Sequence, residues 1–461
     1  MRWLYLSTPP RRQVLCALGE SAILVSSLLA AVVLRLGWDA HEVLLIPKAI
    51  LCALVLQLCL YYGDLYEDFA IRRRVELFLR ISQAFLVGTL ILTLVYFIFP
   101  AFLVGRGILL IYLPLALAGV LAWRSAFRWA WGHEALRETV LVLGTGRSAQ
   151  EIAREILRKA PYGFEVVGFL GEHPAEVGRR LVNPSVIGTI ADLPDLVQKE
   201  KVSLIVVALE DFRGKLPIAE LLRCRLAGIR VEEVTSFFER LTGKILVKSL
   251  RPSWFVFSTG FNKPRLFRSS KRVGEFLVAL VALALIAPLL AVLALLIKLD
   301  GPGPILYRQE RVGEKGRRFS LLKLRTMRAD AEEETGPIWA SRGGDPRATA
   351  VGRWLRALRL DEIPQLLNVL RGEMSFVGPR PERPHFVEKL RQIIPYYDER
   401  HGVKPGITGW AQIKFGYGSN IEDAEEKLQF DLYYIKHMSW IFDVGILFYT
   451  LKVVLLGRGA R

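Results

Sequence analysis

Two adjacent carboxylates, Asp361 and Glu362, open a segment near the end of the chain whose residue types could carry out phosphoryl chemistry. Apolar residues follow at positions 363, 366, 367 and 370, which is the spacing of one helical face. Pro364 is tolerated only in the first turn of a helix, and Gly372 suits a helix end. The pattern therefore predicts a helix that begins at about Asp361 and ends at Gly372.

Arginines flank these carboxylates in the sequence, at positions 356, 359, 371 and 380. Amide donors at a helix N-terminus and arginines hold phosphate groups, while carboxylates hold a metal ion or attack phosphorus. A simpler interpretation is capping, because Asp is a common N-cap residue and Glu is favoured in a first helical turn. The helix by itself favours capping, so the rest of the chain has to decide between the two.

The composition indicates a membrane protein with anionic partners. The 461 residues are 52% hydrophobic and carry a formal net charge of +17, and the mean hydropathy of +0.30 is too high for an ordinary soluble protein. Such a basic, apolar chain suits anionic lipid head groups and phosphorylated substrates. A nucleic-acid partner is not expected, because the apolar segments are long and no nucleic-acid-binding module is recognisable. The four cysteines lack disulfide or metal-site spacing, so apolar packing is their expected role.

Residues 1–135 are predicted to form a bundle of four transmembrane helices. Four apolar stretches are each about long enough to cross a ~30 Å hydrocarbon core: Val14–Leu36, Val43–Gly63, Phe78–Phe99 and Gly107–Trp131. Arginines gather at Arg11 and Arg12, at Arg72–Arg74 and at Arg124 and Arg128, whereas the two alternate loops carry little positive charge. The positive-inside rule places both ends of this bundle in the cytoplasm.

Residues 136–250 are predicted to form a Rossmann-like cytoplasmic module. A buried-strand pattern at 139–143 leads into the turn Gly144–Ala149 and a helix to about Lys159, and further strands are expected at 165–170, 204–208 and 229–231. The Gly-x-Gly-x-x-Ala turn is a moderate signal for a bound nucleotide. A nucleotide site and a structural or regulatory module both remain open.

A fifth apolar segment, Val273–Leu299, follows a linker at residues 251–272 and is interrupted by Pro288. Basic residues flank it on both sides, at Lys271 and at Lys298, which favours one shared membrane surface. We therefore expect a re-entrant helical hairpin that breaks at Pro288 and leaves the bilayer on the side from which it entered. Residues 300–461 then read as a compact, mainly helical domain on the membrane surface.

The C-terminal part resembles the bacterial sugar transferase family, the monotopic polyprenyl-phosphate phosphoglycosyl transferases. The matching runs are Gly301–Ile305, Gln309–Gly313, Lys323–Met327, Leu360–Leu366, Ser375–Pro381 and Pro405–Gln412. The four-helix bundle and the Rossmann-like module resemble the N-terminal half of the larger members, so the resemblance covers nearly the whole chain. The fold class it implies is a mixed α and α/β membrane protein with a monotopic catalytic domain.

The resemblance implies transfer of a sugar-1-phosphate from a UDP-sugar to undecaprenyl (polyprenyl) phosphate, with release of UMP. Asp361 would be the nucleophile that forms a phosphosugar-aspartyl intermediate, and Glu362 would help to bind Mg²⁺. A carboxylate that attacks an anionic diphosphate needs charge neutralisation, for which the candidates are Arg356, Arg380, Lys323 and Arg325. Each of these could instead be a solvated or lipid-facing cation.

Two further positions bear on the family pattern: Asp431 matches it, and Ala287 departs from it. Asp431 lies in a matching run, where it could support the metal or form a structural salt bridge. At the break of the re-entrant helix some members have Ser-Pro, whereas this chain has Ala287 and Pro288. The kink must therefore rest on the proline and its neighbours, without a serine hydroxyl to bond the freed backbone.

Two other classes of function are alternatives. A membrane-anchored nucleotide-sugar dehydratase or epimerase needs a Tyr-x-x-x-Lys pair, and no tyrosine in this chain has a lysine four residues on. A non-enzymatic scaffold for polysaccharide assembly would not require Asp361 and Glu362 among arginines. We expect a multi-pass protein of the bacterial inner membrane, a homodimer, with its catalytic domain in the cytoplasm. The sugar cannot be read, because discrimination among hexoses rests on a few hydrogen bonds.

Overall fold

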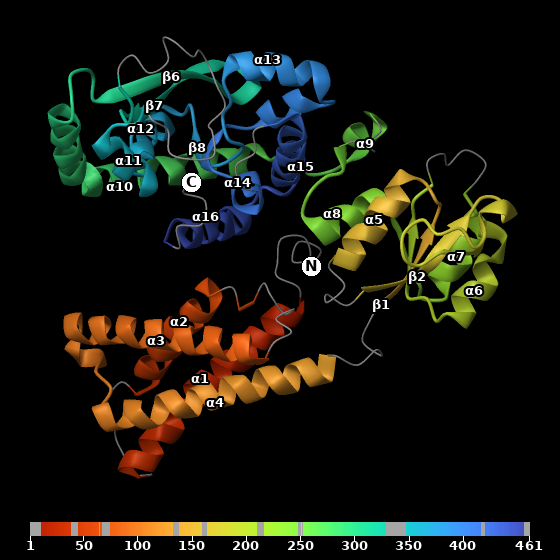
Figure 1. Ribbon diagram of the computed structural model, residues 1–461, viewed down its shortest axis with the longest axis horizontal. Coiled ribbons are helices and arrows are strands. Elements are labelled where there is room, and N and C mark those ends of the chain that lie inside the picture. The colour runs from red at the N-terminus through yellow and green to blue at the C-terminus, as the bar shows by residue number, and fades with distance from the viewer. Residues whose placement is uncertain are drawn as a thin grey trace. The chain divides into compact units, whose positions relative to one another are not determined.

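The computed structural model describes two compact units, Met1–Glu232 and Glu233–Arg461, and each is treated by itself (Figure 1). The residues that the structure describes are 11–37, 45–63, 65–66, 74–131, 138–158, 164–209, 216–247, 250, 252–328, 347–415 and 420–455. Five of the described helices are long and apolar enough to cross a membrane, by length and composition.

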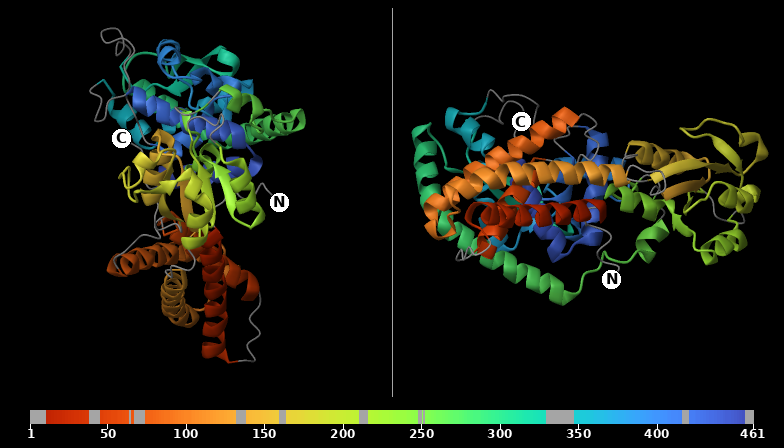
Figure 2. Two further views of the ribbon diagram at one scale, coloured as in Figure 1. Left: turned by 90° about the vertical axis from the view of Figure 1, so that its right-hand side faces the viewer. Right: turned by 90° about the horizontal axis from the view of Figure 1, so that it is seen from below.

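Four of those five helices form a bundle in the first unit: α1 (Arg11–Leu36), α2 (Leu45–Tyr62), α3 (Arg74–Ile98) and α4 (Arg106–Trp131). A short 3-10 turn, Pro100–Phe102, joins the last two. Helix α1 packs mainly on α4 and α2, which lie beside it in Figure 2. Leu28, Leu56 and Tyr112 are fully buried inside the bundle, while residues such as Leu90 and Leu110 are exposed on its outer faces. Helices that are apolar both inside and outside suit a lipid environment.

The same unit contains a parallel α/β sheet with strand order β3-β2-β1-β4-β5. Its elements are β1 (Glu138–Leu143), α5 (Arg147–Arg158), β2 (Phe164–Gly171), β3 (Val186–Thr189), α6 (Leu193–Lys199), β4 (Leu204–Val207), α7 (Ile218–Leu226) and β5 (Arg230–Glu233). Strand β1 pairs in parallel with β2 and with β4, and β2 pairs in parallel with β3. The predicted Rossmann-like order is thus found, with β3 as an additional edge strand.

The turn after β1 requires glycine at its first position. Gly144 has a φ of +110°, and a Cβ there would meet the carbonyl oxygen of Ala208 at 2.7 Å. Close approach of two strand ends at a positive φ is what only glycine permits. Beyond the turn, Thr145 Oγ1 donates to a Glu176 carboxylate oxygen at 2.9 Å, and the Glu172 amide donates to the other at 2.8 Å. The Glu176 carboxylate therefore links the turn after β1 to the loop after β2.

The second unit is mainly helical, as expected. Its helices are α8 (Val234–Thr242), α9 (Pro252–Phe257), α10 (Arg265–Leu299), α11 (Ala350–Ala357), α12 (Gln365–Arg371), α13 (Pro384–Ile393), α14 (Trp410–Lys414), α15 (Ile421–His437) and α16 (Trp440–Leu455). Two small sheets complete it: β6 (Leu306–Val312) pairs antiparallel with β7 (Arg318–Leu324), and β8 (Ser375–Val377) pairs in parallel with β9 (Gly406–Thr408).

The two units divide between Glu232 and Glu233, earlier in the chain than the predicted domain boundary at residue 250. Helix α8 belongs to the second unit, where the Glu239 carboxylate lies 2.8 Å from the Lys436 ammonium and 2.5 Å from the His437 ring of α15. The Trp410 indole also donates to the Gly243 carbonyl at 2.8 Å. These contacts join residues 167 to 198 positions apart, so the local sequence pattern gave no sign of them.

Helix α10 is one helical element of 35 residues that contains Pro288. The helix does not end at Pro288, so the expected hairpin broken at this residue is not confirmed. Figure 1 instead shows two arms that meet at an angle. A proline inside a helix removes one hydrogen bond and crowds the preceding turn, which is enough to bend a helix without ending it.

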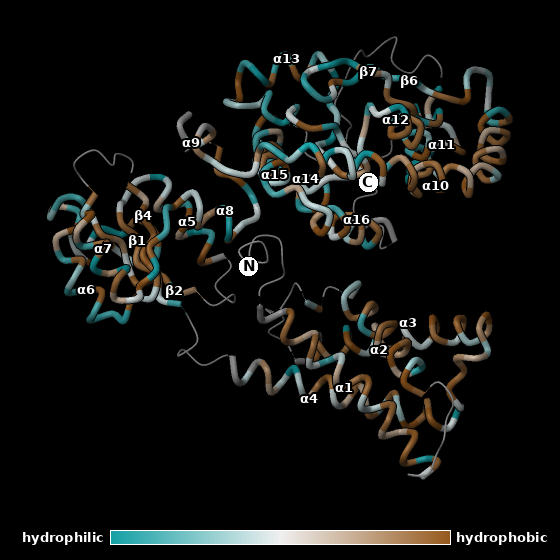
Figure 3. The backbone as a smooth tube through the Cα atoms, turned by 180° about the vertical axis from the view of Figure 1, so that it is seen from behind, coloured by the Kyte–Doolittle hydropathy of each residue, from teal (hydrophilic) through white to brown (hydrophobic). Residues whose placement is uncertain are grey.

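One face of α10 is covered from its first turns to its last. The buried residues recur along a single stripe: Lys271, Glu275, Ala279, Leu293 and Ile297. Ala279 packs in one apolar cluster with Leu366 and Val369 of α12, and Leu293 and Ile297 pack in another with Leu324 and Leu355. The opposite face exposes large apolar side chains throughout, among them Val281, Leu285, Val292 and Leu299. Figure 3 shows the same concentration of hydrophobic residues along α10 and α16.

Candidate active site

The two carboxylates lie in a single 3-10 turn, Leu360–Glu362, that precedes helix α12. Arg359 has a left-handed backbone (φ +55°) and reverses the chain between α11 and this turn. The helix begins at Gln365 and not at Asp361 as predicted, because Pro364 has no N–H to give and occupies the N-cap position. It ends at Gly372, whose φ of +81° is the predicted glycine stop.

The capping interpretation of these carboxylates does not hold. Neither the 3-10 turn nor α12 has a side-chain hydrogen bond at its N-cap, which is Arg359 in the first case and Pro364 in the second. Asp361 is instead buried, with 8% of its surface exposed. A buried carboxylate that caps no helix needs cationic partners.

Lys323 of β7 and Arg380, which follows β8, supply those partners. The Lys323 ammonium lies 3.1 Å from a Glu362 oxygen and 3.8 Å from an Asp361 oxygen. The Arg380 guanidinium lies 3.3 Å from the same Glu362 oxygen. The structure thus brings together four of the predicted site residues from three separate elements.

The environment shifts the pKa values of the two carboxylates in opposite directions. Burial raises the pKa of Asp361, and the neighbouring charge of Glu362 adds to the rise, while Lys323 opposes it. Burial also acts to raise the pKa of Glu362, but the charges of Lys323, Arg380 and Arg359 outweigh it and hold the pKa at about 2. Two adjacent carboxylates with divergent pKa values are typical of catalytic sites, where each has a different task.

Arg356 lies in the last turn of α11, close enough for its charge to lower the pKa of Asp361 against the effect of burial. Its Nε donates to the Thr326 hydroxyl at 2.8 Å, which fixes the guanidinium beside the end of β7. Thr326 was not singled out from the sequence, although it follows Lys323 by three residues in a run that matches the family.

Arg325 lies outside this group. Its guanidinium donates to the carbonyls of Ile297, Gly301 and Pro302, at 2.8, 2.6 and 2.5 Å. Ile297 lies in the last turn of α10, where the C=O groups have no partner within the helix, and Gly301 and Pro302 follow its C-cap. Arg325 therefore closes the C-terminus of α10, and the sequence did not separate this arrangement from phosphate binding.

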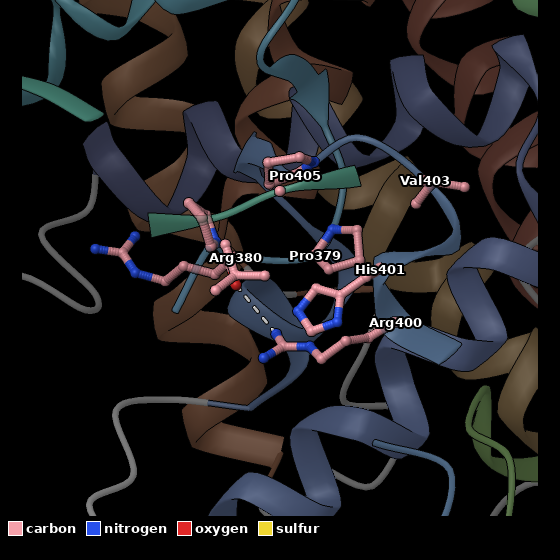
Figure 4. Close-up of a pocket in the computed structure, with 9 residues that line it drawn as sticks. Pro379, Arg380, Arg400, His401, Val403 and Pro405 are labelled. Atoms are coloured by element: carbon pink, nitrogen blue, oxygen red, sulfur yellow. Dashed lines mark hydrogen bonds between the residues drawn. The ribbon is translucent and has the colours of Figure 1, made fainter. Parts of the chain in front are cut away.

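Asp431 forms a buried ion pair. Its carboxylate lies 2.8 Å from the Arg400 guanidinium, and both side chains are almost fully buried. Arg400 also donates to the Arg380 carbonyl at 3.1 Å, which is the dashed line in Figure 4, and His401 lies beside it against Pro379. Of the two roles left open for Asp431, the geometry is that of a structural salt bridge. Arg400 was missed because its partner is 31 residues away.

The donor set available for a metal is limited to carboxylate oxygens. Among the described residues no group of three or more His, Cys, Asp and Glu side chains could hold a metal ion. Asp361 and Glu362 offer two neighbouring carboxylates, and Mg²⁺ is usually bound by one or two carboxylates together with substrate phosphates and water. The residues present fit a hard cation that binds together with a phosphorylated substrate.

Comparison with known proteins agrees with this arrangement. The profile of the family described as "Bacterial sugar transferase" matches residues 266–457, and that described as "CoA-binding domain" matches residues 62–218. A UDP-N-acetylgalactosamine-undecaprenyl-phosphate N-acetylgalactosaminephosphotransferase of Aeromonas hydrophila is 41% identical over 242 residues, which are 52% of this chain and 56% of that protein. A UDP-glucose:undecaprenyl-phosphate glucose-1-phosphate transferase of Escherichia coli (strain K12) is 34% identical over 348 residues, 72% of each chain.

An undecaprenyl-phosphate glucose phosphotransferase of Komagataeibacter xylinus is 32% identical over 343 residues, which are 70% of this chain and 60% of that protein. The matches thus span between about half and three quarters of the relatives' own lengths. The chain belongs to the bacterial sugar transferase family. These relatives are named as transferases, which favours the transferase interpretation over a dehydratase, an epimerase or a scaffold.

Proposed function

We propose that this protein transfers a sugar-1-phosphate from a UDP-sugar to undecaprenyl phosphate and releases UMP. The observation that carries the proposal is the buried pair Asp361 and Glu362, held by Lys323, Arg380 and Arg356 in the part of the chain that matches the sugar transferase family. Relatives of this chain are named for transfer of glucose-1-phosphate or N-acetylgalactosamine phosphate to undecaprenyl phosphate. Family membership and site chemistry therefore support the same reaction.

In the first step Asp361 would act as the nucleophile. A carboxylate oxygen forms a bond to the phosphorus that carries the sugar, and the bond from that phosphorus to the bridging oxygen breaks. The electron pair leaves with UMP, so the sugar phosphate remains on Asp361 as an acyl phosphate. Lys323, Arg380 and Arg356 neutralise charge on the diphosphate, which otherwise repels an attacking carboxylate.

In the second step the lipid phosphate would take the sugar phosphate from Asp361. An oxygen of undecaprenyl phosphate attacks the same phosphorus, the bond to the Asp361 oxygen breaks, and the carboxylate is regenerated. The product is an undecaprenyl-diphospho-sugar, and no oxidant or further reactant is needed. The same cations serve both halves, because each half develops charge at one phosphorus.

We infer that Mg²⁺ is the cofactor, held by Glu362 with the help of Asp361. The low pKa of Glu362 keeps its carboxylate ionised and available as a ligand at every physiological pH. When bound, Mg²⁺ would supply positive charge to the phosphate oxygens and to the leaving UMP. Oxygen ligands favour this ion over zinc, which prefers nitrogen and sulfur.

For the membrane arrangement we propose that α10 enters and leaves the same leaflet. Its buried stripe runs from Lys271 to Ile297 against one domain, while the opposite face is apolar and exposed. A helix with both ends packed on one water-facing domain cannot place those ends on opposite sides of a bilayer. If the four apolar helices before it all span the bilayer, the catalytic domain would lie at the cytoplasmic face of the bacterial inner membrane. The expected homodimer stays a prediction, to be measured by light scattering in detergent.

The proposal is tested by looking for the intermediate. The purified full-length protein is incubated with UDP-glucose, UDP-galactose or UDP-N-acetylgalactosamine and no lipid acceptor, and its intact mass is measured. One sugar should add a sugar phosphate to the peptide that contains Asp361, with release of one equivalent of UMP. Asp361→Asn should lose both signals, whereas the exposed Asp398→Asn should keep them. Turnover by Asp361→Asn at a near-normal rate would refute the assignment of the nucleophile.

A further inference from the structure

A fully buried amide lies between two elements of the site. Asn368, in the middle of α12, has none of its surface exposed. The other buried residues of this helix are the apolar Leu366 and Val369 and the polar Gln365 at its first position. A buried amide that leaves its donors or acceptor unpaired costs free energy, so its partners show what the residue does.

The partners of Asn368 are two main-chain groups of strand β7. The side-chain oxygen accepts from the Leu322 N–H at 3.0 Å, and the side-chain nitrogen donates to the Ser320 carbonyl at 2.8 Å. A second N–H of the amide donates to a Glu373 oxygen at 2.7 Å. The chemistry of these partners fixes the orientation of the amide, because a carbonyl can only accept and an N–H can only donate.

These two main-chain groups lie on the edge of β7 that β6 does not use. In the register of this antiparallel pair Leu322 lies opposite Arg308 and Ser320 lies opposite Glu310. In an antiparallel strand the N–H and C=O of one residue point to the same side, and alternate residues point to opposite sides. The Asn368 amide therefore bonds to the outer edge of β7 as a third strand would.

The hydrogen bonds of Asn368 join α12 to β7, and the side chains that must meet in the site lie on β7 and just before α12. Lys323 follows Leu322 directly on β7, and its ammonium lies 3.1 Å from Glu362. Glu362 lies in the turn just before α12, the helix that carries Asn368. Apolar packing between α12 and β7 resists separation but permits sliding, whereas a pair of hydrogen bonds with opposite directions fixes one register.

We propose that Asn368 is a positioning residue for the transfer reaction, which holds the Lys323 ammonium in register with Asp361 and Glu362. The inference rests on the proposed function of that carboxylate pair. Asn368 itself lies on the strand edge and is assigned no contact with substrate. Its loss should therefore lower kcat and leave the KM for the UDP-sugar nearly unchanged.

The test is a double-mutant cycle on UMP release by the full-length protein in lipid. Asn368→Asp keeps the shape and the acceptor but removes both N–H donors. If Asn368 acts through Lys323, this change should lower kcat about 10-fold to 100-fold in the wild type and less than about 3-fold in Lys323→Ala. An equal loss in both backgrounds would overturn the inference. Full activity of Lys323→Ala alone would refute the cationic site itself, which is a different failure.

Two further variants distinguish a loss of positioning from a loss of folding. Glu373→Ala leaves Asn368 and its bonds to β7 in place and removes only the acceptor of its second N–H, so a smaller fall of about 3-fold to 10-fold is expected, again absent in Lys323→Ala. Val387→Ala makes a cavity in a separate apolar cluster of the same unit and should lower Tm without lowering kcat. If Glu373→Ala had no effect on kcat while Asn368→Asp failed to fold, Asn368 would be structural only.

Discussion

Several cations surround Glu362 and keep its carboxylate ionised. Because Lys323, Arg380 and Arg359 hold its pKa at about 2, replacement by the neutral amide removes a full charge. We expect Glu362→Gln to require more Mg²⁺ for half-maximal activity and to lower kcat about 100-fold, comparable with the loss of one preorganised polar group from an active site. The measurement is UMP release at a series of Mg²⁺ concentrations.

The matched control at this scale is Glu388→Gln, which removes a carboxylate that is mostly exposed on α13. Its Mg²⁺ dependence should equal that of the wild type. Wild-type activity of either protein in excess chelator would exclude a metal at the site.

Two arginines that the sequence offers as phosphate-binding candidates, Arg325 and Arg356, should separate in experiment. Arg325 bonds three carbonyls at the end of α10, while Arg356 is held beside Asp361 by Thr326. Arg325→Ala leaves buried carbonyls unpaired and should destabilise the protein by about 2 to 4 kcal/mol, with kcat of the folded fraction within about 10-fold of normal. Arg356→Ala should do the reverse, lowering kcat strongly with little change in Tm. The opposite pattern in thermal unfolding and UMP release would contradict both assignments.

At the scale of elements, the 3-10 turn Tyr397–Gly402 should make stability depend on pH. Burial, aided by the charge of Arg400, lowers the pKa of His401 to about 4, from about 6.5 in an unfolded chain. The unfolded state binds more protons between these values, so the stabilising contribution is complete above pH 6.5 and is lost as the pH falls toward 4. At 1.36 kcal/mol per pK unit, the difference between about 6.5 and about 4 corresponds to a loss of about 3 kcal/mol.

The facing charges do not change this sign. Arg391 also lowers the pKa of His401, and only Asp398 opposes it. Thermal unfolding of the wild type and His401→Gln, measured from pH 7.5 to 4, checks the expectation. The difference in Tm between the two proteins should shrink toward pH 4. A difference that stays constant over this range would show that His401 has no such role.

Elements were predictable where their signal is local. The apolar stretches, the strand and glycine turn at 139–146, and the glycine stop at 372 all follow from residues within one or two turns. The start of α12 was misplaced because a proline at the N-cap looks the same in sequence as one in the first turn. Strand β3 was missed because four residues, Val186–Thr189, are too short to show alternation.

The functional side chains also divide into those that have a local sequence signal and those that do not. Asp361 and Glu362 were found because they are adjacent and lie in a family motif. The tasks of Arg325 and Asn368 depend on main-chain groups 23 or more residues away in the chain, such as Gly301 and Ser320. No periodicity or composition carries that information, because the same side chains would suit a phosphate or a surface equally well.

At the scale of the whole molecule, the arrangement of α10 predicts which positions are reachable from outside the cell. Single cysteines can be placed at two exposed positions on either side of the apolar segment, Ser269 in the first turns of α10 and Pro304 just after its end, and the four native cysteines are all buried. A membrane-impermeant thiol reagent should label neither position in intact cells and both after the cells are opened. Gly105→Cys, in the loop between α3 and α4, should be labelled in intact cells. Labelling of position 304 but not 269 in intact cells would mean that α10 crosses the bilayer.

The anchoring of α8 sets the size of the smallest working enzyme. Glu239 is held by Lys436 and His437, and the Lys263 ammonium donates to the Lys436 carbonyl at 2.9 Å. A chain cut at Arg268 keeps every proposed catalytic residue yet lacks all of these contacts, so it should be expressed poorly and unfold at a lower temperature. A chain that starts at Glu233 should instead release UMP in lipid at a rate within a few-fold of the full-length protein. Such a result would mean that the second unit suffices for the transfer reaction and that the first unit is an addition to it.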